Sequence, residues 1–151
     1  MKLNERDIQL VRELRTNSRK SIALISRELG IPVSTIFDRI SQMEGPVIKR
    51  YATLLDFSKM GYLIRVCYMI KSSESAKDEL KDFLLMYPRT NTLMRINNGF
   101  DFYADMVFRS MSEMEDFQER LKEQGAVAAE GHYILSEIKQ EAFLSKEQTS
   151  P

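Results

Sequence analysis

A tight turn between two short helical segments constrains this chain more than any other feature. Residues 20–44 read KSIALISRELGIPVSTIFDRISQME, with apolar residues at helical spacing on both sides of Gly30-Ile31-Pro32. Gly30 suits the left-handed position that ends a helix, and Pro32 prevents the helix from continuing at once. Ser21 is a good N-cap for the first segment. The stretch predicts a helix-turn-helix, or else a plain helical hairpin inside another all-α domain.

The second segment, residues 34–43, combines an apolar side with a polar side. The residues that we expect to be buried are Ile36, Phe37, Ile40 and Met43. The opposite side carries hydrogen-bonding groups of the kind that meet base edges in the major groove. The candidate base-reading residues are Ser34, Thr35, Asp38, Arg39 and Gln42. The start of this helix stays open, because Thr35 with Asp38 forms a capping box, whereas Pro32 or Val33 could equally lie in the first turn.

Asp38 itself leaves three interpretations open. Its carboxylate can accept a hydrogen bond from a cytosine amino group, which would make it a base-reading residue. It can also repel the phosphate backbone, or simply cap the helix. The sequence therefore predicts a DNA-reading helix without predicting the bases that it prefers.

Four basic residues around this motif are candidates for phosphate contacts, which set the register on the duplex without reading its sequence. They are Arg19, Lys20, Lys49 and Arg50. The last two belong to residues 47–55, whose β-branched and aromatic content predicts a wing-like strand. The alternative is that these two charges only protect a solvated edge strand from aggregation.

The charge of the chain is unevenly distributed although its formal net charge is zero. Residues 1–55 hold ten Lys and Arg against six Asp and Glu, and the remaining residues hold twelve against sixteen. This asymmetry favours a nucleic-acid module joined to a module with another task. The basic excess is small, so tight binding to double-stranded DNA would need a dimer or a larger assembly.

Single copies of cysteine and histidine limit the chemistry of the chain. Cys67 and His132 each stand alone, which argues against an internal disulfide, a metal site or nucleophilic catalysis. The N-terminus has no signal-peptide core, and no apolar run is long enough for a membrane span. We expect a cytoplasmic protein that is not an enzyme, contacts no membrane and needs no cofactor.

The order of predicted elements indicates two domains of an α+β protein. Asn4 and Asp7 form a capping box that opens a first helix, so residues 1–55 make a helix-turn-helix domain with a following strand. Residues 56–61 are a hinge, residues 62–142 a second domain, and residues 143–151 a polar tail. The second domain reads β-α-β-β-α-β, a ferredoxin-like order. Its strands are expected at 62–70, 92–96, 101–108 and 132–138, and its helices at 75–86 and from Ser112 to Gly125.

Both helices of such a domain cover one face of the sheet, so something must cover the other face. Along the strand at 62–70, Val66, Tyr68 and Ile70 point to one face. Arg65, Cys67 and Met69 point to the other, so neither face is convincingly polar. A sheet of this kind often buries its open face against a second copy. We therefore expect a homodimer, which could assemble further into a tetramer or an octamer.

The chain from about residue 3 to residue 142 resembles the leucine-responsive regulatory protein/asparagine-synthetase regulator family, Lrp/AsnC, also called feast/famine regulators. Several short matches in the right order carry the resemblance. They include Glu28-Leu29-Gly30 before the turn, Val47-Ile48-Lys49-Arg50-Tyr51 after the second segment, Gly99-Phe100-Asp101, and Gly125-Ala126-Val127. The resemblance implies a bacterial or archaeal transcription regulator that binds DNA as an oligomer.

The resemblance also implies an amino-acid effector, bound between subunits near the loop that matches Asn98, Gly99, Phe100 and Asp101. In this interpretation Gly99 would let the ligand approach the backbone, and Asp101 would accept from its ammonium group. The alternative is that Gly99 only makes the turn after Asn97-Asn98 and that Asp101 caps it.

Two other functions compete with the regulator. Sirohaem decarboxylases look like the same two-domain architecture. The stretch Tyr87-Pro88-Arg89-Thr90-Asn91 resembles the start of their motif, but no histidine follows it. A relative that has lost DNA binding and only modulates partner oligomers would fit the near-neutral charge and Asp38. Of these functions, the sequence favours the DNA-binding regulator.

Overall fold

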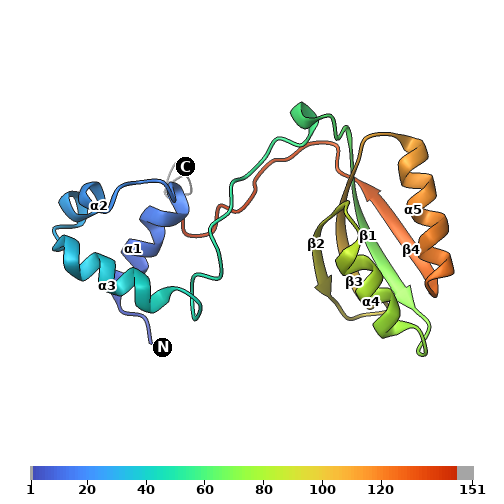
Figure 1. The fold of residues 1–151 in the computed structure, drawn as a ribbon, viewed down its shortest axis with the longest axis horizontal. Coiled ribbons are helices and arrows are strands. Elements are labelled where there is room, and N and C mark those ends of the chain that lie inside the picture. Colours follow the sequence, from blue (N-terminus) through green and yellow to red (C-terminus); the bar gives the residue numbers. More distant parts are fainter. Residues whose placement is uncertain (1, 146–151) are drawn as a thin grey trace. The chain divides into compact units, whose positions relative to one another are not determined.

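The computed structural model describes residues 2–145, which fold into two compact units (Figure 1). The second unit comprises Leu55–Glu137, and the first comprises the residues before it together with the segment from Ile138 onward. Residues 138–142 thus cluster with the first unit, whereas the sequence placed them in the second domain. Of the predicted polar tail, residues 146–151 lie outside the described residues.

The first unit contains three helices, α1 (Glu5–Thr16), α2 (Ile22–Leu29) and α3 (Val33–Met43). The predicted Asn4–Asp7 capping box is present at the start of α1. Gly30 ends α2 with a φ of +65°, the left-handed conformation that its position requires. The helices enclose a small core of Leu10, Ile25, Ile31, Ile36 and Met43. The predicted helix-turn-helix is therefore formed.

Two expectations for this unit are wrong. Phe37 was predicted to be buried, but 59 % of it is exposed, because Ile36 and Met43 already fill the core side of α3. The predicted strand at 47–55 is absent: Glu44 and Ile48 form one isolated bridge, and the residues after it are irregular. Strand-forming side chains gain little here, because this segment has no neighbouring strand within the described residues of its unit.

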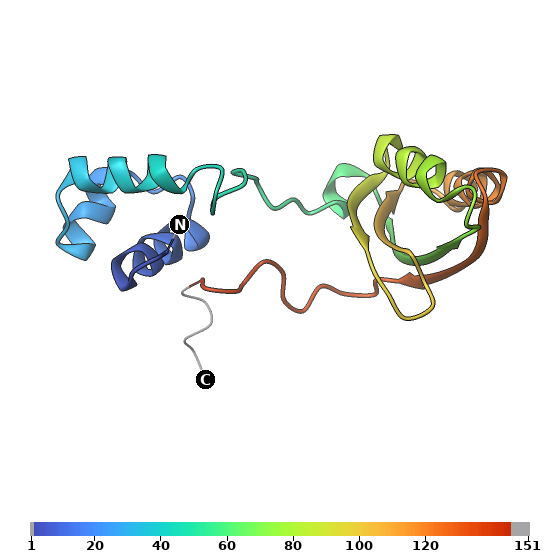
Figure 2. The same ribbon diagram turned by 90° about the horizontal axis from the view of Figure 1, so that it is seen from below.

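The second unit is a four-stranded antiparallel sheet covered by two helices. Its elements are a short 3₁₀ turn (Ser58–Met60), β1 (Ile64–Ser72), α4 (Lys77–Met86), β2 (Thr90–Arg95), β3 (Phe102–Phe108), α5 (Met111–Glu123) and β4 (Ala126–Tyr133). The strands lie in the order β2-β3-β1-β4, and both helices cover the same face (Figure 2). This arrangement confirms the predicted ferredoxin-like class.

The core of this unit lies between the helices and the middle strands. Val66, Tyr68 and Ile70 of β1 point toward the helices and are almost fully buried. Phe117 of α5 packs against the Tyr68 ring with 5.5 Å between ring centroids. The alternation along β1 that the sequence showed therefore separates a helix-covered face from an open face.

Several boundaries in this unit differ from the prediction by one or two residues, and two differences change the interpretation of α5 and β4. The N-cap of α5 is Ser110, whose side chain accepts from the Glu113 backbone, and not Ser112. The last strand lies at Ala126–Tyr133 and not at 132–138. Its sequence, AVAAEGHY, is poor in strand formers, but pairing with β1 holds it in the sheet. Of the more apolar residues that follow, Ile134 still donates a backbone hydrogen bond to Arg65 of β1 at 2.9 Å, and the strand ends before it.

The segment after the second unit returns to the first. The Arg15 guanidinium at the end of α1 donates to the backbone carbonyls of Glu141 (2.6 Å) and Phe143 (3.1 Å) and forms a salt bridge with the Glu141 carboxylate at 3.2 Å. The helical unit is therefore built from both ends of the described chain. Within residues 2–145, every helix is too short or too polar to cross a membrane.

Candidate nucleic-acid interface

The exposed side of α3 is the candidate DNA-reading surface. Ser34, Asp38 and Ser41 lie on the side opposite the buried Ile36 and Met43 and are exposed. Thr35 and Gln42, also exposed, continue this surface toward α1. The predicted polar face is therefore accessible on a helix anchored by its other side.

Phe37, which we expected in the core, adds an apolar group to this surface. It is 59 % exposed, and Val33 beside it is 50 % exposed. The signal was present in the sequence, because Ile36 and Phe37 are about 100° apart on a helix and only one can point to the centre of a narrow core. An aromatic ring on such a surface can contact the methyl group of thymine.

Arg39, a predicted base-reading residue, is already occupied within the helical unit. Its Nε donates to Asp7 Oδ1 at 2.8 Å, its Nη2 to Asp7 Oδ2 at 2.5 Å, and its Nη1 to Gln42 Oε1 at 2.8 Å. The Asp7 side chain is 2 % exposed, and the hydrogen bonds from Arg39 hold its pKa below the usual value. Arg39 thus joins α3 to α1, and all three nitrogens of its guanidinium donate to side chains of the protein.

The four candidate phosphate-binding residues divide into two kinds. The side chains of Arg19, Lys49 and Arg50 are exposed and make no hydrogen bond or salt bridge with the residues that the structure describes. Lys20 instead forms salt bridges with Glu13 (2.6 Å) and with Glu28. Three cations of the helical unit are therefore available for phosphate, and the fourth already has two carboxylate partners.

The candidate effector loop follows β2. Asn98 and Gly99 both have positive φ, +65° and +97°, as a tight Asn-Gly turn requires. Asp101 accepts from the Ser72 backbone at 3.0 Å and the Ser72 hydroxyl at 2.9 Å, and it also pairs with Lys77. The hydrogen bond from Lys77, together with those from Ser72, lowers the pKa of Asp101 to about 2. Its carboxylate is ionised but occupied, while Phe100 is half-buried beside it.

The open face of the sheet is partly apolar and contains a polar cluster. Asp105 is 3 % exposed and accepts from Arg65 (2.9 and 2.8 Å) and from Asn91 (2.7 Å). The Cys67 thiol lies 2.9 Å from the Tyr103 hydroxyl. Burial and this thiol raise the pKa of Tyr103 to about 12. Met69, adjacent in register to Tyr103, and Met94, 55 % exposed, extend the apolar part of this face.

Arg89 and His132 are the residues that bear on the enzyme alternative. Arg89 donates to Glu113 at 2.5 Å and lies over the Tyr62 ring, which ties the start of β2 to α5. The side chain of His132 is 61 % exposed on β4, with its nearest carboxylate, Glu130, at 4.0 Å. Among the described residues, no group of three or more His, Cys, Asp or Glu side chains is arranged to hold a metal ion.

The chain is similar in sequence to known helix-turn-helix proteins. Residues 3–44 match the family described as winged helix-turn-helix DNA-binding. A helix-turn-helix-type transcriptional regulator of Pyrococcus horikoshii is 27 % identical over 143 residues, covering 92 % of this chain and 89 % of the relative. The regulator LrpC of Bacillus subtilis is 23 % identical over 139 residues, covering 91 % and 95 %.

Solved structures share the complete fold. The structure of Bacillus subtilis LrpC superposes with a TM-score of 0.84 at 24 % identity, covering 92 % of this chain and 99 % of that one. A transcriptional regulator of Neisseria meningitidis, solved as a complex with L-methionine, gives a TM-score of 0.84 at 19 % identity, covering 92 % and 94 %. The Mycobacterium tuberculosis leucine response regulatory protein gives 0.80 at 19 %, covering 92 % and 97 %. The resemblance drawn from the sequence is confirmed: residues 3–44 match a helix-turn-helix DNA-binding family, and the chain has the fold of solved regulators of the Lrp/AsnC type.

Proposed function

We propose that this protein is a sequence-specific DNA-binding transcription regulator and not an enzyme. The exposed surface of α3 is the observation that carries the proposal. It offers hydroxyl, carboxylate and amide groups together with one aromatic ring on a helix fixed by its own core. These are the group types that read base edges and thymine methyl groups in the major groove. The relatives named as transcriptional regulators support the same conclusion.

In this proposal the residues of the reading helix have different tasks. Ser34, Phe37, Asp38 and Ser41 meet the bases, with Thr35 and Gln42 at the side nearer α1. Arg39 positions the helix through Asp7, because its guanidinium is bound to that carboxylate. Base reading by Arg39 would require it to leave a buried carboxylate unpaired, which is costly.

Phosphate contacts are assigned to the free cations of the helical unit. Arg19, Lys49 and Arg50 have exposed ammonium or guanidinium groups without partners among the described residues. We assign Lys20 a structural task, since Glu13 and Glu28 already neutralise it. Three phosphate contacts per subunit give a modest salt dependence, which an oligomer multiplies.

The regulator acts as a homodimer or a larger oligomer that an amino acid modulates. The partly apolar open face of the sheet supports the dimer, since a second copy would cover it. The L-methionine complex of the Neisseria meningitidis regulator supports an amino-acid effector for this chain. We assign that effector to the loop Asn98, Gly99, Phe100 and Asp101, where binding of an ammonium group by Asp101 would displace Lys77.

Selection of bound fragments from random duplex DNA tests the proposal. We expect the wild-type protein to enrich a palindromic consensus, because a two-fold symmetric dimer presents two copies of α3. Asp38→Ala, at an exposed side chain, should change the preferred base at one position of each half-site and shift the discrimination there by about 1–3 kcal/mol.

Asp116→Ala is the matched control, because Asp116 is an exposed aspartate on α5 of the other unit. It should give the wild-type consensus. Absence of any enriched sequence at low salt would contradict the DNA-binding proposal and favour the interaction protein. An unchanged consensus for Asp38→Ala would remove Asp38 from the base-reading set while leaving the regulator in place.

A further inference from the structure

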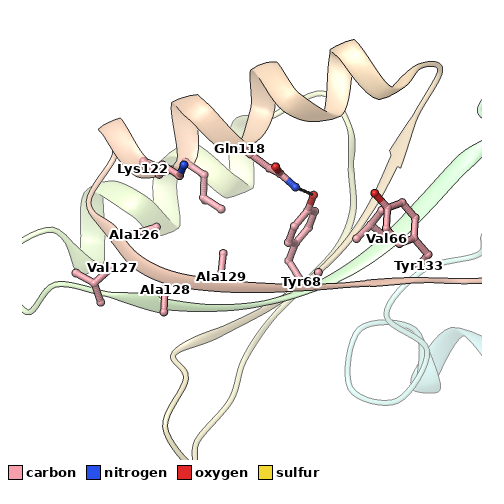
Figure 3. Close-up of a pocket in the computed structure, with 11 residues that line it drawn as sticks. Val66, Tyr68, Gln118, Lys122, Ala126, Val127, Ala128, Ala129 and Tyr133 are labelled. Carbon is pink, nitrogen blue, oxygen red and sulfur yellow. Dashed lines mark hydrogen bonds between the residues drawn. The ribbon is translucent and has the colours of Figure 1, made fainter.

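A cavity of about 390 Å³ lies between α5 and the edge strand β4 (Figure 3). It belongs wholly to the second unit and is separate from both the α3 surface and the Asn98–Asp101 loop. A volume of this size accommodates a small organic molecule.

The small side chains of β4 create this space. Where β1 places Tyr68 and Ile70 in the core, the facing positions of β4 are Gly131 and Ala129. A Cβ atom on Gly131 would lie 2.8 Å from Cε1 of the Tyr68 ring, so glycine is required there. The strand therefore leaves room under α5 instead of filling it. Val66, Leu121, Ala126 and Val127 complete apolar walls.

The roof of the cavity is polar. Gln118 points from α5 toward the sheet, and its Nε2 donates to the Tyr68 hydroxyl at 2.9 Å (Figure 3). Because that hydroxyl accepts from Gln118, its own proton is available to an acceptor in the cavity. Burial raises the pKa of Tyr68, so the hydroxyl stays protonated near neutral pH. The cavity thus contains a fixed hydrogen-bond donor.

Lys122, one turn further along α5, supplies a positive charge at the same cavity. Its ammonium group makes no hydrogen bond or salt bridge with any residue that the structure describes. The lining residues include no aspartate or glutamate. The site therefore has a side-chain partner for a carboxylate but no side-chain carboxylate for the ammonium group of an amino acid.

We propose that this cavity binds a short aliphatic 2-oxo acid. The carboxylate pairs with the Lys122 ammonium, the 2-oxo oxygen accepts from the Tyr68 hydroxyl, and the aliphatic chain lies against the small residues of β4. A zwitterionic amino acid of the same carbon skeleton binds more weakly, because its ammonium group gains no carboxylate partner and lies near the Lys122 cation. This site is distinct from the amino-acid site assigned to the Asn98–Asp101 loop.

Isothermal titration calorimetry of the full-length chain with 4-methyl-2-oxopentanoate tests the proposal. We expect saturable binding at one site per chain, and binding of leucine at least about tenfold weaker. Lys122→Met should weaken binding of the 2-oxo acid about tenfold. Ala129→Leu, which fills the cavity with an apolar side chain, should abolish binding without lowering the thermal unfolding midpoint.

Lys59→Met is the matched control, since Lys59 is an exposed lysine of the same unit outside the cavity, and it should bind like the wild type. Absence of heat up to about 10 mM ligand would overturn the proposal, because an affinity of roughly 1 mM is detectable there. Binding that Asp101→Asn removes and that Lys122→Met and Ala129→Leu leave unchanged would place the ligand at the loop and also overturn it. None of these outcomes depends on DNA binding.

Discussion

At the scale of single residues, Phe37 distinguishes this reading helix from an ordinary polar one. A phenylalanine that is 59 % exposed contributes little to the core of its own unit. Placed beside Ser34, Asp38 and Ser41, its ring can cover the methyl group that marks thymine in the major groove. The same ring offers nothing specific to a G·C pair. We therefore expect it to contribute preference for an A·T pair at one position of each half-site.

Substituting uracil for thymine tests this role of Phe37, because uracil lacks only the methyl group. In the selected site, the substitution should lower wild-type affinity about fivefold, or roughly 1 kcal/mol for one methyl group removed from water. Phe37→Ala should bind more weakly and should no longer distinguish the two bases. Fluorescence anisotropy with both duplexes measures all four affinities.

Val33→Ala is a suitable control for these four affinity measurements, because Val33 is a half-exposed apolar residue on the same helix. It should retain the discrimination between thymine and uracil. Equal discrimination by Phe37→Ala and the wild type would exclude the contact.

At the scale of elements, the pair Asp7–Arg39 joins α1 to α3. Asp7 also closes the capping box with Asn4, so one carboxylate serves the start of one helix and the position of another. Its pKa is lowered in the folded protein, chiefly by the hydrogen bonds from Arg39. A carboxyl group whose folded pKa lies below its unfolded value stabilises the fold above the unfolded pKa, near 3.9. That stabilisation is lost as pH falls through the folded pKa.

Asp7→Asn should therefore destabilise the helical unit at neutral pH by about 1–3 kcal/mol, the range for a buried hydrogen bond to a charged group. The difference from the wild type should be constant above about pH 5 and should shrink as pH falls below about 4. Thermal unfolding followed by circular dichroism between these pH values measures it. Asp38→Asn, at an exposed aspartate of α3, should show neither effect. A difference that grows toward low pH would contradict this account.

The elements that the sequence predicted well are those whose signals are local. The Asn4 cap, the Gly30 turn and the Asn98-Gly99 turn depend on a few adjacent residues, and the structure has all three. The elements that it predicted wrongly depend on distant partners. Strand formers at 47–55 have no strand beside them within the described residues of their unit. The alanine-rich β4, in contrast, is held by β1.

The candidate sites follow the same rule. Sequence pattern placed Ser34, Asp38 and the exposed basic residues on the helix-turn-helix unit, since helical periodicity is a local property. It did not predict that Asp7 occupies Arg39, because these residues are 32 positions apart. The α5–β4 cavity also needed the register of two strands, which no local pattern contains.

At the scale of the whole molecule, we expect the open face of the sheet to form the dimer interface. Met69 lies in the middle of this face on β1 and is half-buried in the single chain. Met69→Arg would place a charge in the contact between two copies, where it would lack a partner. We expect a monomer by sedimentation velocity at concentrations where the wild type is a dimer.

The same variant should lose most of its affinity for the palindromic site, because two linked reading helices bind far more tightly than one. Met86→Arg is the control, since Met86 is 79 % exposed on α4 in the helix layer. It should remain dimeric. A dimeric Met69→Arg protein would assign the interface to another surface.

The contacts of Arg15 with Glu141 and Phe143 have a consequence for how the protein is made. During synthesis, α1, α2 and α3 emerge from the ribosome before the second unit, and the segment that returns to α1 emerges after it. A nascent chain thus completes its sheet before its helix-turn-helix unit acquires its last contacts. Translation that stops before residue 141 yields a product whose helical unit lacks these bonds, so a segment made after the sheet completes a helix made before it.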